Sequence, residues 1–363
     1  MIQTVTLNTG AAMPLVGLGT AHLSRDAGRA ALRDALAAGY RLFDCAKVYG
    51  NEPLVGHELR RAMMTAVNPR DAHHDDADDD DGRGRGGIGR EELFVVSKLW
   101  NDDHAPEDVA TACRRSLRDL GLDYLDLYLV HWPLCWRKGT VLCPGTTPMH
   151  ACWSAMEKLV DEGLVRAIGV SNFDEHQLRA LVNDPRTRIR PAVNQVELHP
   201  LLQQQGLVAS CLEMGVVVTA WSPLGKGAAN ILKHPTLRRI AAGVKSVVEG
   251  KTSLRSNEES DWTAADVALR FNVQRGVAVI PKSTSKRHLA RNLRAADGSW
   301  SLSVEDMSAL LACDRGRRRV PDLIGVWPAS CHPAARVCGW LLAALARIVF
   351  AVVPNALDLK APQ

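Results

Sequence analysis

Four side chains that can hold or transfer protons follow apolar runs at separate places in the chain. Asp44 and Tyr49 lie in RLFDCAKVYGNE, Lys98 lies in FVVSKLW, and His131 lies in LYLVHWP. An ammonium group stabilises a phenolate, so Lys98 is expected to lower the pKa of a neighbouring Tyr49 and ease proton transfer near neutral pH. Asp44 can pair with Lys98, and His131 can hydrogen-bond a carbonyl oxygen. Brought together, the four groups suit the reduction of a carbonyl compound.

A second set of residues, with amide, aromatic and basic side chains, follows the later apolar runs. The amides of Asn172 and Gln195 can hold a carboxamide, and Trp221 offers a flat apolar face to an aromatic ring. Lys282 and Ser283 precede a helix expected to begin near residue 285, whose N-terminal amides favour a phosphate. Together these residues predict a pocket for a nicotinamide dinucleotide.

The elements that must position these side chains follow from the pattern of apolar residues. Eight short apolar runs alternate with amphipathic stretches, and several runs are continuously apolar, as in a parallel sheet covered by helices on both faces. Helices are expected from Ser24 to Gly39 and from Pro106 to Gly121. The runs are 16–20, 41–44, 93–98, 125–131, 165–171, 192–196, 216–221 and 277–282. Eight such units predict a (β/α)₈ barrel, whose active site is built at the carboxyl ends of the strands.

Each catalytic candidate also has an ordinary structural explanation. A strand-end Asp or Lys commonly forms a surface ion pair, and a lone His before Trp-Pro is commonly structural. The chemical interpretation therefore depends on all four side chains meeting at one mouth of the barrel.

Composition excludes several classes of protein. The 363 residues are 46% hydrophobic and 23% charged, which is ordinary globular usage and excludes collagenous, fully disordered and disulfide-scaffold proteins. Nine irregularly spaced cysteines and the lack of a secretory leader indicate free thiols and a cytoplasmic protein. The net charge is only +4 and arises within residues 314–347, so no nucleic-acid partner is expected.

Three stretches lie outside the barrel pattern of residues 1–313. Residues 71–89 hold seven Asp and five Gly and are expected to form a disordered surface insertion, and residues 244–261 form a second polar insertion. His73 and His74 sit among the Asp residues, but without a rigid frame we expect no metal site. In the C-terminal extension, 314–363, the apolar segment 337–353 can be a helix packed on the barrel, an interfacial membrane helix or a tail anchor.

The chain resembles the aldo-keto reductase superfamily, and is most similar to its aldose and aldehyde reductase branch, from about Val5 to Leu311. The motifs that carry the resemblance occur in the family's order and read GLGT, GYRLFDCAKVYGNE, SKLW, LYLVHWP, IGVSNF, PAVNQVELHP, WSPLG and IPKS. The resemblance implies a monomeric barrel that reduces carbonyl compounds with NADPH, without metal or flavin. It makes Tyr49 the proton donor, completed by Asp44, Lys98 and His131, with hydride passing from nicotinamide C4 to the carbonyl carbon.

The resemblance also assigns the binding residues, with some departures from the family pattern. Ala21 replaces an aromatic residue, which leaves Trp132 as the main aromatic wall of the substrate pocket, and Trp221 replaces a stacking Tyr. His288 stands where relatives carry an Arg against the 2′-phosphate, which weakens the preference for NADPH and leaves NADH open. Substrate contacts are assigned to Ala21, Val48, His131 and Trp132. Cofactor contacts are assigned to Thr20, Asp44, Ser171, Asn172, Gln195, Trp221, Ser222, Leu224, Lys282, Ser283, His288 and Asn292.

The expected function is therefore the NADPH-dependent reduction of aldehydes or ketones to alcohols by a monomeric cytoplasmic enzyme. Two alternatives stay open. Potassium-channel β subunits share this fold and bind nicotinamide as regulatory partners, and a membrane-tethered reductase would act on lipid aldehydes.

Overall fold

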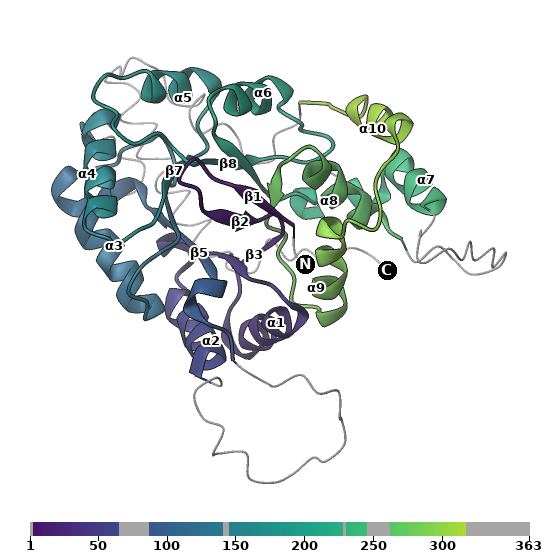
Figure 1. Cartoon of the computed structure of the whole chain (residues 1–363), viewed down its shortest axis with the longest axis horizontal. Helices are drawn as coiled ribbons and strands as arrows, with labels where there is room; N and C mark the ends of the chain where they lie inside the picture. The colour runs from purple at the N-terminus through teal and green to yellow at the C-terminus, as the bar shows by residue number, and fades with distance from the viewer. Residues whose placement is uncertain (1–2, 65–86, 141–144, 228–229, 245–261, 317–363) are drawn as a thin grey trace, which may run out of the picture.

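Eight parallel strands occupy the centre of the computed structural model, and helices surround them (Figure 1). The structure describes residues 3–64, 87–140, 145–227, 230–244 and 262–316. The strands are hydrogen-bonded in chain order from β3 (Gly17–Gly19) to β10 (Ala278–Val279). A parallel bridge between Val16 and Val279 joins the last strand to the first, and the Val279 amide donates to the Leu15 carbonyl at 2.8 Å. These contacts close the ring and confirm the predicted (β/α)₈ barrel.

Each of the eight strands lies within or next to a predicted apolar run. Most strands are buried at every position, which explains why the runs are continuous rather than alternating. The strands are β3 (Gly17–Gly19), β4 (Leu42–Asp44), β5 (Phe94–Leu99), β6 (Leu127–Val130), β7 (Ile168–Ser171), β8 (Val193–Glu197), β9 (Val217–Trp221) and β10 (Ala278–Val279).

The helices begin and end at residues that suit helix ends. Pro106 occupies the first turn of α3, and Gly121 follows it at a φ of 64° in the left-handed region that glycine tolerates. Gly39 ends α1 in the same way at a φ of 103°, whereas the Ser24 side chain makes no capping hydrogen bond. The helices are α1 (Arg25–Ala38), α2 (Glu52–Met64), α3 (Pro106–Leu120), α4 (Met149–Asp161), α5 (Glu175–Val182), α6 (Gln205–Glu213), α7 (Pro235–Gly243), α8 (Ala264–Gln274), α9 (Lys286–Leu293) and α10 (Val304–Leu311).

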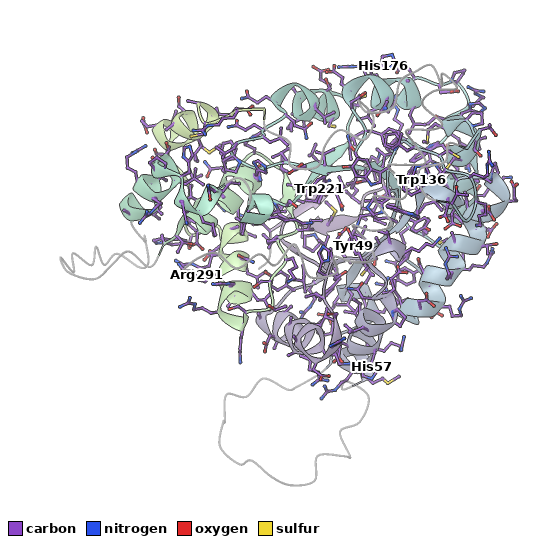
Figure 2. All side chains as sticks on the ribbon, turned by 180° about the vertical axis from the view of Figure 1, so that it is seen from behind. Tyr49, His57, Trp136, His176, Trp221 and Arg291 are labelled. Atoms are coloured by element: carbon purple, nitrogen blue, oxygen red, sulfur yellow. The ribbon has the colours of Figure 1, made fainter. Side chains whose placement is uncertain are left out.

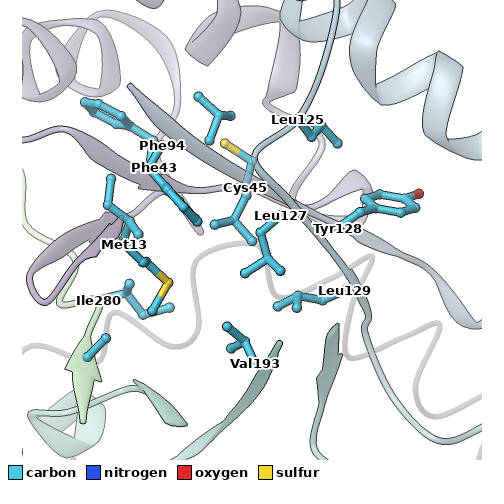
Figure 3. Packing of buried hydrophobic residues seen from close by; sticks show 14 of the residues in the cluster. Met13, Phe43, Cys45, Phe94, Leu125, Leu127, Tyr128, Leu129, Val193 and Ile280 are labelled. Atoms are coloured by element: carbon cyan, nitrogen blue, oxygen red, sulfur yellow. The ribbon is translucent and has the colours of Figure 1, made fainter. Parts of the chain in front are cut away.

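The core is built from side chains of many strands. Phe43, Leu127, Leu129, Val193 and Ile280 are each at most 5% exposed, and Figure 3 shows them in one cluster. A second buried cluster joins α7, α8 and α10. Burial of this kind contributes about 1.5–3 kcal/mol for each large apolar side chain, so the barrel is a rigid frame for the strand ends.

An antiparallel hairpin that the sequence pattern did not predict precedes the barrel. Its strands are β1 (Thr4–Thr6) and β2 (Ala12–Pro14), and Figure 1 shows them across the middle of the ring. Met13 of this hairpin is 1% exposed and belongs to the main cluster. Three-residue strands are too short to give a clear apolar period.

Most of the stretches predicted outside the barrel lie outside the described residues: 71–86 of the first insertion, 245–261 of the second, and 317–363 with the apolar segment 337–353. The Ile88 amide donates to the Ala62 carbonyl at 3.4 Å, so the described residue Ile88 is bonded to α2. The described cysteines are free thiols, while Cys143, Cys331 and Cys338 are not described.

Within the described ranges, every helix is too short or too polar to span a lipid bilayer. The same part of the chain contains no cluster of three or more His, Cys, Asp or Glu residues fit to hold a metal ion.

Candidate active site

A buried ion pair between Asp44 and Lys98 forms the centre of the site. The two residues lie at the carboxyl ends of the paired strands β4 and β5, and Lys98 Nζ lies 2.6 Å from Asp44 Oδ1. Both side chains are at most 2% exposed. Burial disfavours the charged ammonium, but the Asp44 carboxylate and Tyr49 favour it more, so the pKa of Lys98 lies above its ordinary value. The barrel thus holds a permanent positive charge beneath its mouth.

Tyr49 ends the short 3₁₀ helix η1 (Lys47–Tyr49) and faces this charge. Lys98 Nζ donates to Tyr49 Oη at 3.4 Å and lies 5.1 Å from the centre of the Tyr49 ring. Burial raises the pKa of Tyr49 to about 12, and the opposing effect of Lys98 is smaller. The predicted effect of Lys98 on the pKa of Tyr49 is thus present, but burial outweighs it. The phenol is protonated at neutral pH and is ready to donate that proton.

His131 follows β6 and completes the group of four. Its ring packs edge-on against the Tyr49 ring, with centroids 6.1 Å apart. Burial, together with the charge of Lys98, holds the pKa of His131 well below its usual range. Its Nδ1 atom has no hydrogen-bond partner among the described residues. The structure thus places a neutral imidazole, able to bond a carbonyl oxygen, beside the phenol.

Further hydrogen bonds fix the Asp44 segment. The Gln195 amide donates to Asp44 Oδ1 at 2.8 Å, so the carboxylate is held from β8 as well as from Lys98. The Thr20 hydroxyl donates to the Asp44 backbone carbonyl at 2.8 Å. Asn51, which sequence reasoning did not select, donates to the Thr20 and Leu23 carbonyls, both at 2.8 Å. These bonds join the turn after Tyr49 to the first strand.

The predicted nicotinamide side of the site is also connected to His131. The Trp221 indole donates to Asn172 Oδ1 at 3.0 Å, and the Asn172 amide donates to the His131 carbonyl at 2.9 Å. The Ser171 hydroxyl donates to the Gln195 backbone carbonyl at 2.7 Å. Figure 2 shows Tyr49 and Trp221 in the central part of the molecule, away from the peripheral His57 and His176.

Backbone strain marks the same strand ends. Asn172, directly after β7, has a φ of 63°, and Ser222, directly after β9, has a φ of 49°. The left-handed region is costly for serine and less so for asparagine, and strained residues of this kind cluster at functional sites. Both residues belong to the predicted cofactor set.

The predicted phosphate side lies where β10 meets α9. The Ser283 hydroxyl accepts a hydrogen bond from the Ser285 amide at 3.1 Å, and Ser285 caps α9 by accepting from the His288 amide at 3.4 Å. Lys282 and His288 are exposed, whereas Asn292 is buried. Leu224, after β9, is partly buried against both core clusters.

Gly19 in the GLGT motif has a steric role at this junction. Its amide donates to the Pro281 carbonyl at 3.3 Å, and a Cβ on residue 19 would lie 2.7 Å from the Ile280 carbonyl oxygen. Only glycine allows this approach of the first strand to the last. The motif therefore brings the Thr20 end of the site next to Lys282.

The predicted substrate side contains more aromatic surface than expected. Val48 is 46% exposed, and Ala21 and Trp132 are partly exposed. Trp100, which sequence reasoning missed, packs edge-on against His131 at 5.0 Å and against Trp136 at 5.4 Å between ring centroids. The missed signal for Trp100 is its place two residues after Lys98 in SKLW.

Comparison with known proteins now decides the family. Residues 15–315 match the sequence profile of the Aldo/keto reductase family. The chain belongs to this family. It is 38% identical to "Aldo-keto reductase family 1 member A1-A" of Danio rerio over 92% of this chain and 98% of the relative. It is 37% identical to a probable NAD(P)H-dependent D-xylose reductase of Arthroderma otae, over 86% and 92% of the respective chains.

A solved structure agrees with this assignment. The aldose reductase from Schistosoma japonicum superimposes with a TM-score of 0.74 and 33% identity, over 89% of this chain and 97% of that one. The chain is accordingly an oxidoreductase of the aldo-keto reductase family. The predicted fold class, family and enzyme class are confirmed.

The chemistry of the donor set fits a nicotinamide dinucleotide. Gln195 uses its amide nitrogen on Asp44, while its side-chain oxygen accepts no hydrogen bond from a described residue. Trp221 is partly exposed and is held in orientation by Asn172. Lys282 is exposed and forms no ion pair within the described ranges. An amide oxygen, an aromatic face and a cation are thus available for a carboxamide, a planar ring and a phosphate.

Proposed function

We propose that this aldo-keto reductase converts aldehydes or ketones to alcohols with NADPH, and that Tyr49 is the proton donor. The observation that carries the proposal is the double contact of Lys98, whose buried ammonium touches both Asp44 and the Tyr49 hydroxyl. An ammonium beside the phenol supports this role, because it would stabilise the phenolate that proton donation leaves, and both groups lie at or after the carboxyl ends of strands, where barrel enzymes have their active sites.

The protein's own residues handle the proton. When bound, NADPH supplies the hydride that the carbonyl carbon accepts. Tyr49 gives its hydroxyl proton to the carbonyl oxygen, and the phenolate that remains is stabilised by Lys98. Asp44, itself held by the Gln195 amide, keeps the ammonium in place, and neutral His131 orients the carbonyl oxygen. A proton from solvent restores the phenol before the next turnover.

The remaining assigned residues are proposed to hold the cofactor. Asn172 and Gln195 would bind the carboxamide, with Trp221 stacked on the ring. Lys282, Ser283 and the amides at the start of α9 would bind the adenosine phosphate.

The test of this proposal is NADPH oxidation in the presence of a panel of aldehydes and ketones. Turnover with at least one carbonyl compound supports it. Tight NADPH binding without turnover of any compound would indicate the regulatory alternative and overturn it.

The titration of the site predicts a flat pH profile for kcat in the reducing direction. A proton donor must be protonated, so its contribution is lost as pH rises through its pKa, which burial raises to about 12 for Tyr49. His131, whose pKa lies well below its usual range, stays neutral. With saturating NADPH and substrate, kcat should vary by less than about twofold between about pH 6 and 9. A titration in kcat with a pKa inside that window would contradict the assignment.

A His288→Arg substitution is expected to favour NADPH over NADH. A fixed guanidinium binds phosphate with charge-assisted hydrogen bonds, whereas exposed His288 is a weaker partner for an anion. The ratio of kcat/KM for NADPH to that for NADH should rise about tenfold, corresponding to about 1.4 kcal/mol.

The matched control for this change is His176→Arg. His176 is equally exposed but lies on α5 at the periphery (Figure 2), so the same added charge should leave the cofactor ratio unchanged. An unchanged ratio for His288→Arg would show that residue 288 does not face the 2′-phosphate.

A further inference from the structure

Asp103, a buried carboxylate outside the catalytic group, forms ion pairs with three cationic side chains. The Asp103 side chain is 0% exposed, and its oxygens lie 2.6 Å from Lys47 Nζ, 2.8 Å from Arg115 Nη2 and 2.5 Å from Lys138 Nζ. Burial alone would raise the pKa of Asp103, but the cations outweigh it and hold that pKa below its ordinary value. Asp103 is therefore ionised and closely surrounded.

The three cations come from parts of the chain that are far apart in sequence. Lys47 begins η1, two residues before Tyr49. Lys138 lies in the loop after β6 that also carries Trp132 and Trp136, and Arg115 lies on α3. Asp103 itself ends η3 (Asn101–Asp103), the turn that follows β5. One carboxylate thus connects the segments on either side of the predicted substrate mouth.

The same turn also contacts the edge-on rings of Trp100 and Trp136, called here the aromatic wall. The Trp136 amide donates to the Asn101 carbonyl at 2.7 Å, and the Trp100 ring lies edge-on to both His131 and Trp136. The position of this wall relative to Tyr49 therefore depends on the turn that Asp103 anchors.

The charges around Asp103 balance only while it is ionised. Lys47 also lies 3.3 Å from Asp102, and Lys138 lies 3.0 Å from Asp108, so three cations face three carboxylates. Asp102 and Asp108 are partly exposed to solvent, which screens their contributions, whereas the Asp103 carboxylate is not. Removal of its charge would leave three cations clustered around a neutral group.

We propose that Asp103 is a positioning residue of the reductase, which holds the Tyr49 turn through Lys47 and the Trp136 loop through Lys138. The proposal rests on the proposed function of Tyr49 as proton donor. The ion pair of Asp103 with Lys47, called the Lys47 arm, and its ion pair with Lys138, called the Lys138 arm, have different consequences. The Lys47 arm places the proton donor and therefore controls kcat, whereas the Lys138 arm places the substrate wall and therefore controls KM.

The experiment removes each of these two ion pairs by a separate substitution. Lys47→Met should lower kcat about tenfold with little change in KM, since misplacing a reacting group by about 1 Å can cost up to about 10²-fold. Lys138→Met should raise KM for the carbonyl substrate about fivefold, equal to about 1 kcal/mol of substrate binding, with little change in kcat. Lys47→Arg keeps the charge and should recover most of the lost kcat.

The matched control is Arg114→Met. Arg114 lies on α3, the helix that carries Arg115, and its guanidinium pairs with the Glu162 carboxylate at 2.6 Å. The side chains of Arg114 and Glu162 are both about half exposed. Its removal should leave kcat and KM unchanged. If Lys47→Met and Lys138→Met behave like this control, or if both lower kcat and raise KM together, the proposal is overturned.

A readout that does not need turnover separates this proposal from the function itself. In Lys47→Met, amide hydrogen exchange should accelerate in residues 47–50, where Tyr49 and Gly50 donate to the Ala46 and Lys47 carbonyls. In Lys138→Met it should accelerate in residues 134–140 and leave 47–50 unchanged.

The outcomes of the two measurements are distinguishable. If the unmodified enzyme reduces no carbonyl compound, the proposed function fails and hydrogen exchange alone decides the positioning role. Unchanged exchange in both segments overturns that role whatever the activity. Asp103→Asn should accelerate exchange in both segments at once, and the two lysine variants still decide the matter if this variant does not fold.

Discussion

Replacing Tyr49 with phenylalanine is expected to lower kcat for carbonyl reduction by about 10²–10⁴-fold, the usual contribution of a positioned proton donor. The change removes only the hydroxyl that Lys98 contacts at 3.4 Å. The ring that packs against His131 is kept, so the shape of the mouth is preserved. Binding of NADPH, followed by fluorescence titration, should change by less than about twofold, because the proposed cofactor contacts do not include this hydroxyl.

The matched control for this variant is Tyr124→Phe. Tyr124 lies before β6, at the end of the barrel remote from the site, and its ring is stacked between Arg90 and Arg166 at 3.9 Å from each guanidinium. Removing its hydroxyl should leave kcat unchanged. Equal turnover by Tyr49→Phe and the unmodified enzyme would exclude Tyr49 as the donor, whereas loss of NADPH binding would show that residue 49 helps to form the cofactor site.

Replacing Lys98 with methionine should abolish both activity and a large part of the stability. Asp44 would remain 2% exposed without its cation, and breaking a buried ion pair in this way costs about 3–5 kcal/mol. The phenolate would also lose its stabilising charge, so kcat should fall by at least about 10²-fold. Denaturant unfolding and steady-state kinetics measure the two effects on one preparation.

A second substitution separates the two effects of Lys98. In Asp44→Asn/Lys98→Met no unpaired charge remains, so part of the lost free energy of unfolding should return while kcat stays low. As a control, Arg188→Met removes an exposed guanidinium that pairs with Asp161 at 2.6 Å and lies 3.9 Å from Glu157, and it should lower the free energy of unfolding much less than Lys98→Met does. If the free energy of unfolding of Lys98→Met is no lower than that of this control, the buried pair of Lys98 with Asp44 does not stabilise the fold.

The two variants distinguish chemistry from architecture. Tyr49→Phe should lose turnover and keep its fold, because the hydroxyl forms one long hydrogen bond with Lys98. Lys98→Met should lose both, because Lys98 also donates to the Cys45 carbonyl at 2.8 Å and pairs with Asp44. A stability loss in both variants of equal size would mean that Tyr49 is structural as well.

The strands and the meeting of the catalytic candidates were predictable from the sequence for a simple geometric reason. Residues that end parallel strands of one barrel share one rim, so Asp44 and Lys98 had to be close once the fold was recognised. Gly39 and Gly121 marked helix ends because a left-handed residue is needed there. Such features depend on local pattern and topology alone.

Burial and long-range contacts were not predictable in this way. The net pKa of Tyr49 depends on how much protein covers its ring, which spacing along the chain does not show. Lys98 lowers this pKa as predicted, but burial raises it more. Asp103 looks in the sequence like an ordinary acidic residue before a helix, since Lys47 and Lys138 lie 56 and 35 residues away. Trp136 is likewise distant from Trp100 and reaches it only through the folded loop.

We propose that this site directs hydride from the cofactor to a carbonyl carbon beside Tyr49. The most direct test uses NADPH carrying deuterium at C4, prepared as each of the two epimers, with an aldehyde that the enzyme turns over. We predict that one epimer yields alcohol labelled on the former carbonyl carbon and that the other yields unlabelled alcohol, as measured by mass spectrometry. Unlabelled alcohol from both epimers would contradict the account.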